Sequence, residues 1–97
     1  MSEKLSIVIP AYNEQQNILK CICELRAALR EHEIPYEIIV VNDNSTDSTE
    51  GVVRAEMDTD DSIRLVNRTP PGGFGRAVRS GIEVVRGDVV EIGRAHV

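Results

Sequence analysis

Three consecutive polar residues follow an apolar run in the first half of the chain. Asn42, Asp43 and Asn44 come directly after Glu37–Val41. A carboxylate at the end of a buried strand accepts hydrogen bonds from a nucleobase N–H or a ribose hydroxyl, and the same residue types also form the Asx turns that precede helices. Ser45 is sufficient as the helix cap in such a turn, which leaves Asp43 without a structural role and favours a ligand-binding role for it.

A second group of residues able to bind a ligand follows the apolar run Leu5–Ile9. Tyr12 offers a flat ring for stacking on a base, and Asn13 and Glu14 offer hydrogen-bond acceptors. Each also has a structural interpretation. Asn13 is predicted to cap the next helix, with Gln16 three residues later completing a capping box, and this is the preferred interpretation of Asn13. Glu14 suits a helix N-terminus, and Tyr12 suits packing.

The stretch from residue 64 to residue 86 is basic, although the whole chain is acidic. Its only acidic residue is Glu83. Glycines open a predicted helix in this stretch, and backbone N–H groups together with guanidinium groups bind phosphate at such places. A solvated helix face with a flexible entry loop explains the same residues equally well. The arginines are Arg64, Arg68, Arg76, Arg79 and Arg86, and the glycines are Gly72, Gly73 and Gly75.

Composition argues against several classes of protein. A formal net charge of -5 at pH 7 disfavours a nucleic-acid partner, because such binding draws on basic residues. No apolar run approaches the roughly 20 residues that span a bilayer, and no signal-peptide core follows Met1, so the chain is expected to be cytoplasmic. Cys21 and Cys23 point to different faces of a predicted helix, and His32 and His96 have no companions at ligand spacing, so no metal ligand is assigned.

Alternating strands and helices are expected to position these residues. Apolar runs without polar alternation predict strands that are buried on both faces, which is typical of a parallel sheet. The sequence therefore predicts an α/β fold, with a Rossmann-like parallel sheet and helices on both faces. The predicted strands are Leu5–Ile9, Glu37–Val41, Ile63–Val66 and one that begins at Val89; the helices between them carry Ile18 to Leu29, Val52 to Met57 and Phe74 to Val85.

Open sheets of this class bind ligands in the crevice at the carboxyl ends of their strands. Residues 10–14, 42–45 and 68–76 each follow a predicted strand. The three segments are expected to meet at one edge of the sheet and to form a single site there.

Three motifs in this order resemble family 2 glycosyltransferases of the GT-A fold, and within that family dolichyl-phosphate mannose synthase-like enzymes. They are Ser6–Glu14 (SIVIPAYNE), Tyr36–Asp47 (YEIIVVNDNSTD) and Gly73–Gly81 (GFGRAVRSG). Three ordered motifs are more specific than any one of them. The resemblance implies that residues 1–90 are the nucleotide-sugar-binding part, the N-terminal half, of a GT-A domain.

The resemblance implies that the intact enzyme transfers a sugar from a nucleotide-diphosphate sugar such as GDP-mannose to a polyprenyl phosphate. It implies an inverting transfer that requires Mg²⁺ or Mn²⁺, at the cytoplasmic face of a membrane. Asn42 stands where the family usually has an Asp. No catalytic residue is assigned. The implied donor-binding residues are Pro10, Tyr12, Glu14, Val41 and Asp43, and the candidate phosphate-side residues are Arg68, Gly73, Gly75 and Arg76.

The resemblance ends after Asp88-Val89-Val90. The family continues into an Asp-x-Asp type motif that binds the metal, whereas this chain reads EIGRAHV from residue 91. The metal-binding segment is therefore expected to be absent and the chain by itself inactive. The codons ATC GGA AGA GCA CAC GTC TGA encode Ile-Gly-Arg-Ala-His-Val and a stop, and they match a common sequencing-adapter read. Residues 91–97 are therefore interpreted as a non-native tail, and genomic DNA encoding these residues would contradict that.

Two alternatives to an enzyme of this family remain. One is a non-catalytic nucleotide-binding or interaction module of the same fold. The other is a nucleotidyltransferase with a similar α/β beginning. Such enzymes usually have a glycine-rich loop after the first strand, and the segment from Pro10 to Glu14 is not one.

Overall fold

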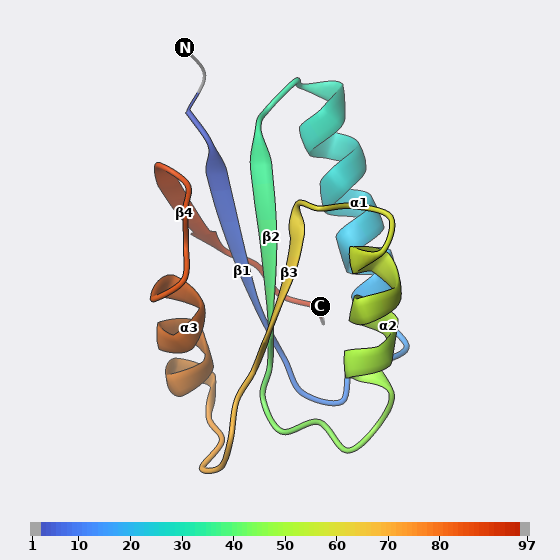
Figure 1. Cartoon of the computed structure of the whole chain (residues 1–97), viewed down its shortest axis with the longest axis vertical. Helices are drawn as coiled ribbons and strands as arrows, with labels where there is room; N and C mark the ends of the chain where they lie inside the picture. The colour runs from blue at the N-terminus through green and yellow to red at the C-terminus, as the bar shows by residue number, and fades with distance from the viewer. Residues whose placement is uncertain (1–2, 96–97) are drawn as a thin grey trace.

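A computed structural model describes residues 3–95 as alternating strands and helices (Figure 1). His96 and Val97, the end of the predicted non-native tail, lie outside the described residues. Among residues 3–95, no helix is both long and apolar enough to cross a membrane. The strands are β1 (Leu5–Ala11), β2 (Tyr36–Asn42), β3 (Ile63–Asn67) and β4 (Val89–Ile92), and the helices are α1 (Ile18–Glu31), α2 (Thr49–Met57) and α3 (Phe74–Ile82).

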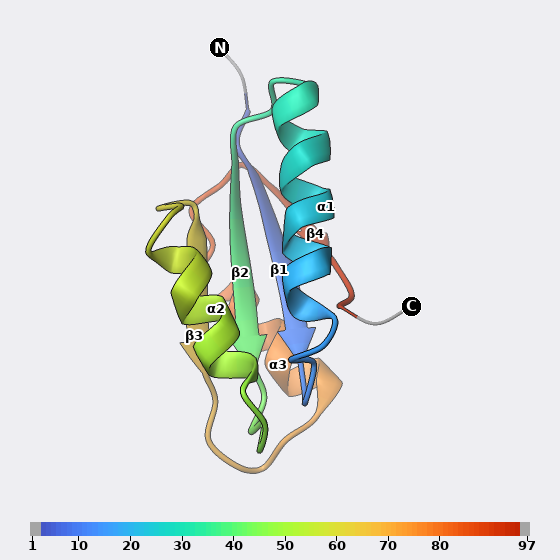
Figure 2. The same cartoon turned by 90° about the vertical axis from the view of Figure 1, so that its right-hand side faces the viewer.

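The strands form one parallel sheet in the order β3-β2-β1-β4. Helices α1 and α2 cover one face and α3 covers the other, as both views show (Figure 1, Figure 2). The predicted Rossmann-like sheet with helices on both faces is therefore confirmed. Since all the strands run in the same direction, β1, β2 and β3 end at one edge, and the loops that follow them gather there.

Burial on both faces explains why the strands are apolar without alternation. Ile7 and Ile9 of β1 pack into the cluster that includes α1 and α2, whereas Val8 between them packs toward α3. Helix α3 lies close to the sheet because Gly81 faces it. A Cβ at Gly81 would overlap the Val8 side chain and lie 3.0 Å from Cγ2 of Val41, so no larger residue fits without displacing the helix.

Glu37 forms a buried polar cluster near the amino edge of the sheet. Its carboxylate accepts hydrogen bonds from the Ser6 hydroxyl (2.6 Å), the Arg86 amide (2.6 Å) and the Arg64 guanidinium (2.9 Å). Burial opposes the charge, but the bonds from Ser6, Arg86 and Arg64 hold the pKa of Glu37 at about 2, below its ordinary 4.5. The Arg64 guanidinium is therefore part of this buried cluster.

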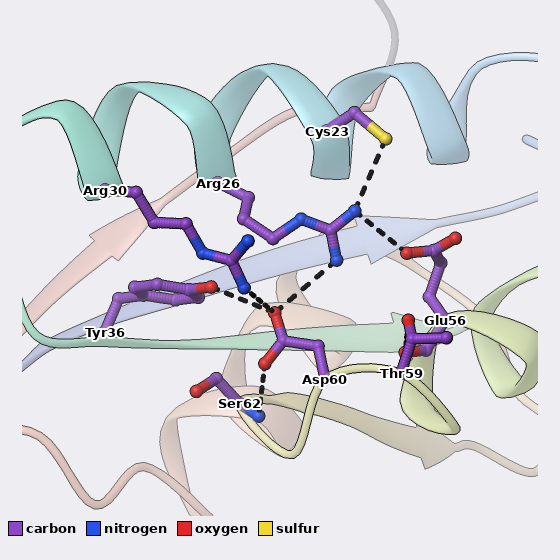
Figure 3. Close-up of polar contacts among 8 residues, drawn as sticks. All are labelled: Cys23, Arg26, Arg30, Tyr36, Glu56, Thr59, Asp60 and Ser62. Carbon is purple, nitrogen blue, oxygen red and sulfur yellow. Dashed lines mark hydrogen bonds and ion pairs between the residues drawn. The ribbon is translucent and has the colours of Figure 1, made fainter.

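Asp60 joins α1 to the segment before β3 (Figure 3). It accepts hydrogen bonds from the Ser62 amide at 2.8 Å and the Tyr36 hydroxyl at 2.9 Å, and both Arg26 and Arg30 of α1 pair with it. Burial alone would raise the pKa of Asp60, but these donors hold it below its ordinary value. This cluster lies near the start of β2, away from the loops at the carboxyl edge.

The structure continues through part of the predicted tail. Glu91 and Ile92 pair with Ile7 and Val8 of β1, and the Gly93 amide donates to the Val8 carbonyl at 2.8 Å. Ala95 is buried against the cluster of β1 and α1. Glu91 and Ile92 therefore complete β4, and residues 93–95 continue beyond it in contact with β1 and α1.

Candidate functional site

A hollow of about 520 Å³ lies at the carboxyl edge of the sheet. It is formed by the loop after β1, the loop after β2 and the segment between β3 and α3, so the three polar segments singled out in the sequence do meet. Another groove, of about 450 Å³, lies between α1 and residues 93–95 and contains none of the residues assigned above. The hollow is lined by Tyr12, Asp43, Asn44, Pro70, Gly72, Gly73 and Phe74.

Asp43 is the acidic residue of the hollow and is nearly buried, with 8% of its surface exposed. One carboxylate oxygen, Oδ1, accepts from the Arg68 guanidinium at 2.7 Å and from the Asn44 amide at 3.0 Å. The other, Oδ2, accepts from the Gly73 backbone N–H at 2.8 Å. The expectation that Asp43 has no structural role was therefore wrong, because its carboxylate anchors the segment that leads to α3.

The sheet ladder continues past the strand ends and fixes Asp43. Its own N–H donates to the Ala11 carbonyl at 2.8 Å, and the Arg68 N–H donates to the Asn42 carbonyl at 3.0 Å. Backbone bonds on both sides hold Asp43 in place, so the carboxylate is preorganised for any ligand that enters the hollow.

The Arg68 guanidinium holds the segment between β3 and α3 in place. Besides Asp43, its guanidinium donates to the Ser80 hydroxyl at 3.0 Å and the Pro71 carbonyl at 3.1 Å, and only 14% of the side chain is exposed. The Gly73 N–H is likewise bonded to Asp43. In this structure Arg68 and Gly73 position the loop, and their assignment to the phosphate side stays a prediction.

Gly75 and Arg76 lie in the first turn of α3 and do not line the hollow. Arg76 is exposed and donates to the Gly72 carbonyl at 3.3 Å. Gly75 has open space where a side chain would stand. Of the arginines assigned to the phosphate side, Arg76 therefore has the more accessible guanidinium.

Of the residues assigned to donor binding, Tyr12 and Asp43 line the hollow, whereas Pro10, Glu14 and Val41 do not. Tyr12 is 60% exposed and lines the hollow with Asp43. Val41 is fully buried against the α3 face of the sheet, so its side chain does not reach the hollow as the resemblance implied. Pro10, half-buried, pairs in register with Val41. Glu14 lies outside the hollow, and its Oε2 is buried without a hydrogen-bond partner among residues 3–95.

The loops after β1 and β2 bind each other, and the helix caps predicted for them were wrong. Asn13 has a left-handed backbone (φ 51°), and its Oδ1 accepts from the Thr46 N–H at 2.7 Å, while α1 begins only at Ile18. The Ser45 hydroxyl accepts from the Asn13 N–H at 2.9 Å and does not cap α2. Asparagine adopts the left-handed region more readily than most residues, which suits it to this bridge.

Two residues that line the hollow, Pro70 and Phe74, were not individually proposed to bind a ligand from the sequence. Phe74 was expected on the apolar face of its helix, but it is 55% exposed at the first position of α3, and Ala77 and Gly81 form the buried face. An aromatic residue that directly follows two glycines at a helix start was the signal available for it. Gly72 lies beside the carboxylate, since a Cβ there would be in van der Waals contact with Oδ2 of Asp43 at 3.4 Å.

The residues that the structure describes do not form a binding site for a divalent metal ion. Within residues 3–95, no group of three or more His, Cys, Asp or Glu side chains lies close enough together to hold an ion. The carboxylate of Asp43 is already bonded to Arg68 and Gly73. We therefore assign no residue of this chain to metal binding.

A family model described as "Glycosyl transferase family 2" matches residues 6–92. The chain belongs to glycosyl transferase family 2. Among family members, it is 36% identical over 91 residues to the dolichyl-phosphate beta-glucosyltransferase ALG5A of Trichomonas vaginalis, a match that covers 89% of this chain and 28% of that protein. It is also 36% identical over 89 residues to an undecaprenyl-phosphate 4-deoxy-4-formamido-L-arabinose transferase of Pseudomonas fluorescens, with 89% and 26% covered.

Solved glycosyltransferases have the same fold. The mannosyltransferase PcManGT of Pyrobaculum calidifontis, solved in complex with GDP-Man and Mn²⁺, superimposes with a TM-score of 0.83 at 26% identity over 98% of this chain and 28% of that one. The predicted family and the GT-A fold are therefore confirmed. This family 2 chain spans between a quarter and a third of the length of these relatives.

Proposed function

We propose that this chain forms the donor-nucleotide part of a longer glycosyltransferase, which transfers a sugar from a nucleoside diphosphate sugar to a polyprenyl phosphate. The observation that carries the proposal is that exposed Tyr12 and buried Asp43 line one hollow at the carboxyl edge of a GT-A sheet. The names of the relatives from Trichomonas vaginalis and Pseudomonas fluorescens support a lipid phosphate as the acceptor.

Tyr12 and Asp43 supply complementary contacts to a nucleoside. The Tyr12 ring packs against the face of the base, where apolar and π contact is gained. An ionised carboxylate has about four lone-pair sites, and the Asp43 bonds described above leave one of them open, on Oδ2. That site accepts one hydrogen bond from a base N–H or a ribose hydroxyl.

The proposed donor is a GDP-mannose-like sugar nucleotide, because PcManGT was solved with GDP-Man. In the proposed transfer, a phosphate oxygen of the lipid attacks the anomeric carbon as the bond to the nucleoside diphosphate breaks, with inversion. An ionised phosphate is already a nucleophile and requires no base, so no residue of this chain is given that role. Because a polyprenyl phosphate is a membrane lipid, the proposed location of the whole enzyme is the cytoplasmic face of a membrane.

Replacing Tyr12 by alanine is expected to weaken GDP binding by about tenfold, since stacking on an aromatic ring contributes on the order of 1–3 kcal/mol per base. Tyr12→Phe keeps the ring and is expected to bind as the wild type does. Isothermal titration calorimetry measures the affinity of both variants for GDP and for UDP. Leu19→Ala is the matched control, because Leu19 is an exposed apolar residue that does not line the hollow.

Two outcomes of this titration would contradict the proposal. A wild-type chain that melts cooperatively but binds neither nucleotide has no donor site. Binding that Tyr12→Ala leaves unchanged would place the nucleotide elsewhere on the chain.

A further inference from the structure

Two of the three aromatic residues of this chain line the same hollow. The three are Tyr12, Tyr36 and Phe74. Tyr36 has a structural role, because it is half-buried and its hydroxyl donates to Asp60 at 2.9 Å. Tyr12 and Phe74 are 60% and 55% exposed and both line the hollow. A planar ligand in the hollow would remove apolar area of both rings from water.

The fold does not use Phe74 for its own core. The buried cluster beneath α3 consists of Val8, Ile39, Val41 and Ala77, with other side chains packed around it, and Phe74 belongs neither to it nor to the cluster on the opposite face. The ring therefore contributes little to the packing of α3 on the sheet.

The backbone before Phe74 is nevertheless fixed relative to Asp43. The N–H of Gly73, the preceding residue, donates to Oδ2 of Asp43 at 2.8 Å. The Arg94 guanidinium also lies over the Phe74 ring, 5.4 Å from its centroid, but Arg94 belongs to the segment interpreted as a non-native tail and is not counted as an anchor of the ring. Because the bond from Gly73 holds the backbone beside Asp43, the Phe74 ring is well placed to contact a ligand that binds the Asp43 carboxylate.

We propose that Phe74 is a nucleobase-contacting residue, the second aromatic residue that lines the hollow with Tyr12. This inference rests on the proposed function. Asp43 accepts a hydrogen bond from the nucleoside, while the two rings that line the hollow with it contact the base. A purine has more surface than a pyrimidine, so loss of the Phe74 ring reduces affinity for GDP more than affinity for UDP.

The test compares four forms of the full chain by calorimetry with GDP and UDP: wild type, Phe74→Ala, Phe74→Leu and Phe74→Tyr. Phe74→Ala and Phe74→Leu are expected to bind GDP about tenfold more weakly, and Phe74→Tyr to bind it within about twofold of wild type. Ile82→Ala is the control, because Ile82 is an exposed apolar residue on the same helix, outside the hollow. Equal melting temperatures establish that the variants fold.

The outcomes separate this inference from the proposed function. If the wild type binds GDP and Phe74→Ala binds it equally well, the role of Phe74 is overturned while the donor site stands. If Phe74→Leu binds as the wild type does, or Phe74→Tyr as weakly as Phe74→Ala, the aromatic contact is overturned. If the folded wild type binds no nucleotide, the proposed function and this inference fail together.

Discussion

Replacing Asp43 by alanine is expected to reduce the affinity of the chain for GDP by at least about tenfold, because a hydrogen bond to a charged group contributes on the order of 1.5–3 kcal/mol. The substitution also removes the acceptor for Arg68 and for the Gly73 N–H, so the wall of the hollow that carries Phe74 loses its anchor. Calorimetry with GDP on the folded variant measures the change.

A matched set of variants separates the two effects of Asp43. Arg68→Ala keeps the carboxylate but loosens the loop, so it is expected to weaken GDP binding less than Asp43→Ala does. Asp61→Ala removes an exposed carboxylate outside the hollow and is expected to change nothing. Wild-type affinity in a folded Asp43→Ala chain would show that this carboxylate does not contact the nucleotide.

Replacing Glu37 by glutamine is expected to lower the free energy of unfolding by about 3–5 kcal/mol, because removing one partner of a buried ion pair leaves the other uncompensated. Glu37 is 2% exposed, and its loss leaves the Arg64 guanidinium without its carboxylate. Urea denaturation near neutral pH measures the change. Glu24→Gln is the control, since Glu24 pairs with Lys20 at 3.8 Å on an exposed helix face, where ion pairs contribute little.

Glu37 is also expected to make the stability of the fold depend on pH. The pKa of Glu37 is lowered from 4.5 to about 2, so its contribution is fully present above pH 4.5 and is lost as the pH falls toward 2. The loss amounts to about 3 kcal/mol over that range. Glu37→Gln is expected to show a shallower decline, with a remainder from Asp60, whose pKa is also lowered. Parallel declines in the two proteins would contradict this role.

The fold could be predicted from the sequence because its signals are local. Strands buried on both faces, such as Glu37–Val41, are apolar at consecutive positions, and the helices between them carry apolar residues at helical spacing. The parallel direction of the ladders follows from the helix between each pair of consecutive strands, whereas the strand order β3-β2-β1-β4 was not predicted. The sequence therefore correctly predicted that the three polar segments meet at one edge of the sheet.

The contacts within the site could not be predicted, because they join residues far apart in the chain. Asn13 and Ser45 each have a side chain that suits a helix cap, but they bridge two loops that only the folded sheet brings together. The hydrogen-bond partners of Asp43, Arg68 and Gly73, likewise belong to a segment far along the chain, between β3 and α3. Local capping rules consider only neighbours in sequence, so they assigned Asn13 and Ser45 to caps and left Asp43 free.

The central claim is that a donor nucleotide binds in the hollow between the loops after β1 and β2 and the segment before α3. The most direct test is a titration of the ¹⁵N-labelled chain with GDP, followed by amide chemical shifts. Binding in the hollow is expected to shift the amide signals of Tyr12, Asp43, Gly72 and Phe74 most. Shifts concentrated instead along the groove between α1 and residues 93–95, or none at all in a folded chain, would contradict it.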